Sequence, residues 1–120
     1  MELKTDILPA TEFSPQFIQG MVDRMAVSFH KYGKVADAYP VKVQAIASLM
    51  DRLRLYARGD TTKGIKPGNT EYLIDAANFA MIEFMHPAHE AAHFTGTDAD
   101  GSPGRRTYDG LKTAKRNDDL

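Results

Sequence analysis

The segment over residues 69–85 is predicted to be a helix that is apolar on almost every side. It reads NTEYLIDAANFAMIEFM, and at 100° per residue its large apolar side chains cover most of the helix circumference. These side chains are Tyr72, Leu73, Ile74, Phe79, Met81, Phe84 and Met85. Such a helix has to be covered by others, yet one domain of 120 residues can build only a modest core. The sequence therefore predicts an all-α fold, with three main amphipathic helices and a short fourth in a bundle completed by oligomerisation.

The polar residues of this helix are confined to one stripe. Glu71, Asp75 and Asn78 follow one another at i, i+4 and i+7, so they share one edge of the helix. A buried carboxylate without a partner costs several kcal/mol. The stripe is therefore expected either to be neutralised by Arg or Lys from a neighbouring helix or to hold a cation.

Another helix is expected from Pro15 to about Tyr32. Ser14 suits the N-cap, proline suits the first turn, and Gly33 suits the position after the last turn. The residues before it, up to Phe13, are expected to form a short extended arm.

A further helix is expected over residues 39–58, with Pro40 in its first turn. Its apolar residues are expected on the buried side, and these are Val43, Ile46, Leu49, Met50, Leu53 and Tyr56. Its charged residues, which include Asp51, Arg52 and Arg54, are expected on a solvated face.

The C-terminal part of the sequence is poor in apolar residues. Residues 88–93 are expected to form the short fourth helix, and residues from Thr95 onward read as a mobile tail. The sequence thus predicts a helical domain over 1–94 and a tail over 95–120.

Composition narrows the possible partners. With 15 Lys and Arg against 16 Asp and Glu, the net charge is −1, so binding to nucleic acid or to an anionic membrane is not expected. The N-terminus lacks the pattern of a signal peptide, and no uninterrupted apolar run is long enough to span a membrane. A cytoplasmic location is expected. With no cysteine, thiol catalysis and cysteine-bound zinc are excluded.

A glycine-rich connection, GDTTKGIKPG over residues 59–68, links the last two long helices. It lacks the phosphate-binding pattern G-x-x-x-x-G-K-[ST], and a flexible connection is the expected role. An alternative is that Lys63 and Lys66 contact the phosphates of a substrate.

The run His89-Glu90-Ala91-Ala92-His93 matches H-E-x-x-H, the pattern of zinc hydrolases. Pro87 precedes it closely, and Ala99 stands where a third ligand would be needed, so loop histidines are the expected interpretation. Whether His86, His89 and His93 bind a metal is left open.

The order of helices, the Lys-Tyr-Gly helix ending, the glycine-rich connection and the run TEYLIDAANFAMIEF together resemble the small MazG-like nucleotide pyrophosphohydrolases, in particular the phage-type members, over Val22 to Pro87. The resemblance implies an all-α dimer or tetramer that hydrolyses (deoxy)nucleoside triphosphates to monophosphate and pyrophosphate with Mg²⁺. It implies that Glu71 and Asp75 are the catalytic residues and metal ligands. The substrate-binding residues would be Asn78, Lys31, Arg54 and Lys63.

One family motif has no counterpart in the sequence. The E-x-x-E pattern of an earlier helix is missing, because Asp23 and Asp51 each stand without a second acid at i+3 or i+4. This departure keeps an alternative open, namely a non-catalytic helical interaction or oligomerisation protein in which Asp75 and Asn78 pair with Arg52 or Arg54.

Overall fold

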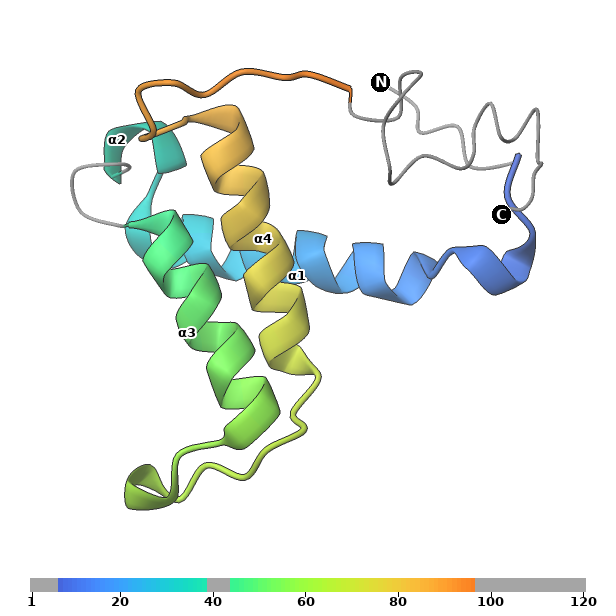
Figure 1. The fold of residues 1–120 in the computed structure, drawn as a ribbon, viewed down its shortest axis with the longest axis vertical. Helices are drawn as coiled ribbons and strands as arrows, with labels where there is room; N and C mark the ends of the chain where they lie inside the picture. The colour runs from blue at the N-terminus through green and yellow to red at the C-terminus, as the bar shows by residue number, and fades with distance from the viewer. Residues whose placement is uncertain (1–6, 39–43, 97–120) are drawn as a thin grey trace. The chain divides into compact units, whose positions relative to one another are not determined.

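The computed structural model describes residues 7–38 and 44–96, and this part of the chain is helical (Figure 1). The α-helices are α1 (Pro15–Tyr32), α2 (Val35–Ala38), α3 (Ala45–Arg58) and α4 (Glu71–Met85), and the 3-10 helices are η1 (Ala10–Glu12) and η2 (Thr61–Lys63). The only β-pairing in these ranges is an isolated bridge between Asp60 and Ile65. The predicted all-α class is therefore confirmed for the described residues. None of their helices is both long and apolar enough to cross a bilayer.

The chain divides into two units, Met1–Glu90 and Ala91–Leu120. The first unit contains every helix of the described ranges. Of the predicted tail over 95–120, only residues 95 and 96 are described, and they have no regular structure. Residues 97–120 lie outside the described residues, so the predicted mobility of this segment stays a prediction.

Within the first unit, α3 and α4 lie side by side as an antiparallel pair, and α1 crosses them (Figure 1). Gly20 lies where α1 meets α4, because a Cβ at this position would come within 2.7 Å of Ile74 Cδ1. A Cβ at this position would require the end of the Ile74 side chain to move. The glycine therefore gives Ile74 of α4 room against α1.

The core is thin. Among the described residues the buried ones are Ala45, Leu55, Gly59, Ala76 and Asn78, and no large side chain is completely buried. Four of these residues belong to α3 and α4, and Gly59 is the C-cap of α3, so the pair of antiparallel helices holds the best-packed part of the first unit.

Both predicted ends of α1 are confirmed. Ser14 Oγ accepts a hydrogen bond from Phe17 N–H at 3.0 Å, which satisfies one of the free donors of the first turn. At the other end Gly33 has φ of 83°, and its N–H donates to Phe29 O at 2.9 Å. The expectation for the preceding arm is corrected, because Ala10–Glu12 form η1 and are not extended.

The expectation for α3 is partly wrong. The helix begins at Ala45, six residues after the expected start at residue 39, and residues 39–43 lie outside the described part of the chain. Its buried side is only partly as expected. Leu49 and Tyr56 are half-buried, but Ile46, Met50 and Leu53 are exposed, and Ala45 and Leu55 are buried instead. The helix has apolar residues on two sides, and periodicity alone does not decide which of them meets another helix.

The predicted helix over residues 88–93 is absent, since this segment contains a bend and turns. The Glu83 carboxylate accepts hydrogen bonds from Ala88 N–H at 3.1 Å and from His89 N–H at 3.3 Å. These bonds hold the chain after Pro87 back against the last turns of α4. The short helix of the fold is instead α2, directly after α1.

The connection over residues 59–68 is folded back on itself. Asp60 accepts hydrogen bonds from Thr62 N–H at 3.1 Å and Thr62 Oγ1 at 2.6 Å, and the hydroxyl contact is the main cause that lowers the pKa of the Asp60 carboxyl. Asp60 also pairs with Ile65 through backbone hydrogen bonds of 2.8 and 2.9 Å. Gly68 N–H donates to Tyr56 O at 2.7 Å, which ties the end of the connection to α3.

We predict that Gly59→Ala destabilises the protein by about 2 kcal/mol or more. Gly59 has φ of 68°, and a Cβ there would clash with the backbone oxygen of Ile65, so the connection would have to open. Gly64 is the matched control: its φ is 71°, but a Cβ would meet nothing within 4 Å, so Gly64→Ala is expected to cost only about 1 kcal/mol. Urea unfolding of both variants measures the difference. Equal losses would contradict the packing argument.

Candidate functional site

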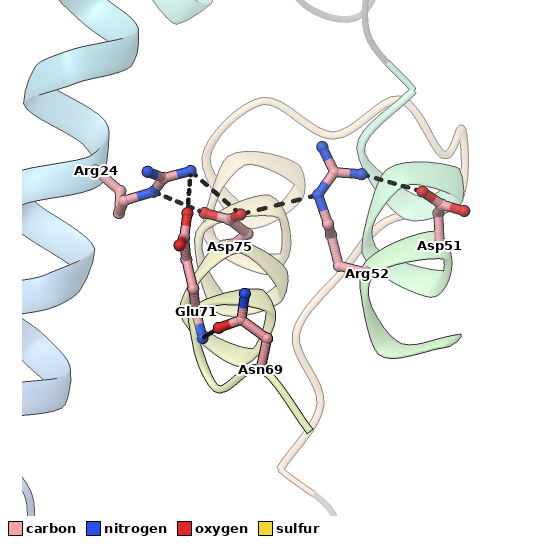
Figure 2. Close-up of polar contacts among 6 residues, drawn as sticks. All are labelled: Arg24, Asp51, Arg52, Asn69, Glu71 and Asp75. Carbon is pink, nitrogen blue, oxygen red and sulfur yellow. Dashed lines mark hydrogen bonds and ion pairs between the residues drawn. The ribbon is translucent and has the colours of Figure 1, made fainter. Parts of the chain in front are cut away.

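Arg24 of α1 meets both carboxylates of the polar stripe on α4 (Figure 2). Its Nη2 lies 2.9 Å from Glu71 Oε2, and its Nε lies 3.1 Å from Asp75 Oδ1. A second contact, from Nη2 to Asp75 Oδ2 at 3.4 Å, gives the fork geometry that a guanidinium favours with a carboxylate. The hydrogen bond to Asp75 is the main cause that raises the pKa of Arg24 above its ordinary value.

The ion-pair network continues from α4 to α3 (Figure 2). Arg52 Nε lies 3.9 Å from Asp75 Oδ2, and Arg52 Nη1 lies 3.1 Å from Asp51 Oδ2. Asp51 Oδ1 also accepts from Arg54 Nη2 at 2.6 Å. The Arg52 guanidinium stands 5.4 Å from the centre of the Phe79 ring, within the range of a cation–π contact. Asp75 therefore joins α1 and α3 through two arginines.

Asp75 is the most enclosed charge of this network. Its side chain is 15% exposed, whereas the Arg52 side chain is 32% exposed and that of Arg24 45%. Electrostatic attraction is therefore strongest around Asp75, where water screens it least. The sequence left open whether basic residues or a bound cation neutralise the acidic stripe. The structure shows arginines of the neighbouring helices beside it.

Asn78 completes the stripe one turn further along α4. It is 6% exposed, and its Nδ2 donates to Met21 O of α1 at 3.1 Å. Its Oδ1 is buried and has no hydrogen-bond partner among the described residues. Each polar residue of the stripe thus contacts α1.

A groove of two adjoining hollows, of about 280 and 330 Å³, lies beside the network. The two hollows share six lining residues and are therefore continuous; these are Met25, Ser28, Tyr32, Val35, Phe79 and Ile82. One end is polar and is lined by Arg24, Lys31, Arg52, Asp75 and Asn78. The other end is largely apolar, with Phe29, Gly33, Ala38 and Ser48 in its wall.

The structure brings together part of the predicted site. Asp75, Asn78 and Lys31 line the polar end of the groove, and Glu71 is linked to it through Arg24. Two predicted substrate-binding residues do not line it: Arg54 pairs with Asp51, and Lys63 lies in η2, in the connection between α3 and α4. Their predicted role stays untested.

Arg24 is the residue of this site that the sequence analysis missed. Arg52 was placed on a solvated face, with pairing to Asp75 as the alternative; the structure shows it over Phe79 and 3.9 Å from Asp75, so the alternative holds for this contact. The sequence does contain a sign of this role, because Arg24 comes between Met21 and Met25 on the side of α1 that meets α4. A basic residue within the apolar face of one helix is a candidate partner for an acidic residue within the apolar face of another helix.

Mg²⁺ binds hard oxygen ligands such as carboxylates. Glu71 and Asp75 have suitable oxygens, but in the described arrangement Arg24 contacts both, and Arg52 approaches Asp75 as well. Two guanidinium charges beside these oxygens repel a divalent cation. Across residues 7–38 and 44–96, no three or more His, Cys, Asp or Glu side chains are gathered as a metal site. This arrangement therefore does not fit Mg²⁺, and no chemical step is derived from it.

The histidine motif also lacks the backbone geometry of a zinc site. The H-E-x-x-H pattern needs a helix to bring the two histidines onto one face, one turn apart. Residues 88–93 have no helix. The structure therefore gives no support to the zinc-hydrolase alternative.

Comparison with known proteins adds no relative. No protein-family model matches the chain, and no match was found among curated proteins or solved structures.

We predict that Asp75→Asn destabilises the protein by about 1–3 kcal/mol, because Arg24 and Arg52 lose a partly buried anionic partner. Asp23→Asn is the matched control. Asp23 lies on the exposed side of α1 and accepts only a neutral hydrogen bond, from Gln19 at 2.9 Å, so its replacement is expected to cost less than about 0.5 kcal/mol. Urea unfolding measures both variants. A loss for Asp75→Asn no greater than that of the control would show that the network does not support the fold.

Proposed function

We propose that this chain is a helical nucleotide-binding protein that takes its ligand in the groove between α1, α3 and α4. The observation that carries the proposal is the division of this groove into a basic polar end and an apolar end with aromatic side chains. A nucleotide has the same division, between its phosphates and its base. The hollows of about 280 and 330 Å³ are comparable to small-molecule pockets.

The polar end is lined by three basic side chains, Arg24, Lys31 and Arg52, and by one acidic side chain, Asp75. Glu71 and Asp51 also contact the two arginines and offset part of their charge. Lys31 has no ion-pair partner in the described parts of the chain, so its ammonium group is available to a phosphate. Arg24 and Arg52 present guanidinium groups that can contact phosphate oxygens in addition to Asp75.

The apolar end supports binding of a flat base. Phe79 lies at the junction of the two hollows, and Tyr32 and Phe29 stand in the wall with 74% and 60% of their surface exposed. Exposed aromatic rings gain burial and stacking when a base lies against them. The ligand would therefore place its base near these rings and its phosphates near Lys31.

The MazG-like resemblance supports the same ligand class and adds a reaction, Mg²⁺-dependent hydrolysis to monophosphate and pyrophosphate. The geometry supports binding alone, because Arg24 and Arg52 hold the carboxylates assigned to the reaction. We therefore keep the pyrophosphohydrolase activity as the second candidate, supported by the resemblance. In both cases the protein is proposed to work as a homo-oligomer.

Nucleotide binding is tested by calorimetry with a panel of ribo- and deoxyribonucleoside triphosphates, with inorganic triphosphate as the probe that lacks a base. We predict that Lys31→Ala weakens the affinity for the best nucleotide on the order of tenfold, because one charged contact to phosphate is lost. Lys63→Ala is the control of equal charge change outside the groove, and it is expected to leave the affinity unchanged. Failure of every nucleotide to bind would overturn the proposal, and a larger effect of Lys63→Ala would move the site to the connection between α3 and α4.

Hydrolysis is tested separately by release of pyrophosphate from the same panel in the presence of Mg²⁺. The resemblance predicts turnover that is abolished in Asp75→Ala. Asp23→Ala, which removes a carboxylate outside the network, is expected to keep the activity. Nucleotide binding without pyrophosphate release would leave a non-catalytic binding protein and remove the hydrolase candidate.

A further inference from the structure

The ion-pair network beside the groove contains as many acidic as basic side chains. Its members are Arg24, Arg52 and Arg54 on the basic side and Asp51, Glu71 and Asp75 on the acidic side. The charges of these side chains therefore balance within the network. Lys31 also lines the polar end of the groove, and it has no ion-pair partner in residues 7–38 and 44–96. The positive charge that the polar end can offer without competition from a carboxylate is thus the single charge of Lys31.

We infer that the groove recognises one phosphate group, so that its ligand is a nucleoside monophosphate. This inference rests on the proposed nucleotide binding and narrows it to one class of nucleotide. A phosphate monoester carries a charge of about −1.5 to −2 at pH 7. One ammonium group offsets a large part of that charge, and the guanidinium groups of Arg24 and Arg52 add hydrogen-bond donors.

The place of Lys31 agrees with contact to the phosphate nearest the base. Lys31 lines the polar hollow together with Tyr32 and Phe79, and these two aromatic residues also line the apolar hollow. The ammonium group therefore belongs to the hollow that adjoins the proposed base position. In a nucleotide the α-phosphate is separated from the base by the sugar alone, whereas the β- and γ-phosphates lie further away.

A second or third phosphate finds no further unpaired cation in the lining of this groove. Negative charge that leaves water without a partner is costly. The charges of Arg24 and Arg52 are already matched by carboxylates, and the Asp75 carboxylate in the wall repels a phosphate beside it. Triphosphates are commonly bound with Mg²⁺ held by carboxylates, and the described arrangement of Glu71 and Asp75 does not fit that ion. The β- and γ-phosphates are therefore expected to remain in solvent and to add little affinity.

The test is calorimetry with four ligands of the same base and sugar, namely the nucleoside and its mono-, di- and triphosphate, in a purine and in a pyrimidine series. EDTA is present, so that no divalent cation neutralises the phosphates. The monophosphate is expected to bind on the order of tenfold more tightly than the nucleoside, and the di- and triphosphate within about threefold of the monophosphate.

The outcomes separate this inference from the proposed function. An affinity that rises about tenfold with each added phosphate overturns the inference, while nucleotide binding stands. A monophosphate that binds no more tightly than the nucleoside overturns it as well. Absence of binding by every member of both series removes the nucleotide proposal and the inference with it.

A second experiment adds one positive charge to the network. Glu71→Gln removes a carboxylate from Arg24, whose contact with Asp75 at 3.1 Å remains. This variant is expected to bind the diphosphate about fivefold more tightly than the monophosphate, because the second phosphate then has a cationic partner. Glu12→Gln is the matched control, since Glu12 is exposed in η1 and contacts Thr11 outside the network. It is expected to keep the ratio of the wild type.

Equal affinity ratios in Glu71→Gln and Glu12→Gln would overturn the inference, because the balance of charge in the network would then not set the number of phosphates. Urea unfolding of both variants checks that they are folded. The ligand series on the wild-type protein does not depend on the folding of either variant.

Discussion

The contact of Arg24 with Glu71 and Asp75 sets the position of α1 on α4. The Asp75 side chain is only 15% exposed, so a nearby cation stabilises the packing of α1 against it. Arg24 supplies that cation from α1, and Arg52 adds a second from α3. Because few apolar side chains are buried, these polar contacts, with the close approach of Gly20 to Ile74, hold α1 in place.

The same contact shapes the groove. Arg24, Arg52 and Asp75 form part of its polar end because they are held together by the network, while Lys31 lies about two turns further along α1. Glu71 and Asp51 contact the same two arginines, so the network holds carboxylates on both sides of Asp75. Of the basic residues that line the polar end, Lys31 is the one outside this network. The proposed phosphate contacts would therefore use Lys31 together with arginines that also hold the helices together.

The helix α3 has two different sides. Its inner side contributes Ser48 and Arg52 to the groove. On another side Ile46, Met50 and Leu53 are exposed, although they are apolar. The packing of α3 on α4 therefore uses only part of the apolar surface of this helix.

The sequence by itself determined several helix ends: α1 begins after Ser14 and ends before Gly33, and α4 ends at Met85 before His86 and Pro87. Capping residues and proline act over a few positions along the chain, so a reader of the sequence can see their effect. The stripe of Glu71, Asp75 and Asn78 was likewise visible, together with its need for partners. Only the tertiary structure decided that Arg24 is the partner and that α3 turns Ala45 and Leu55 inward in place of Ile46 and Met50. Those outcomes depend on which helix faces approach each other, and a contact between residues 51 positions apart leaves no periodic trace in the sequence.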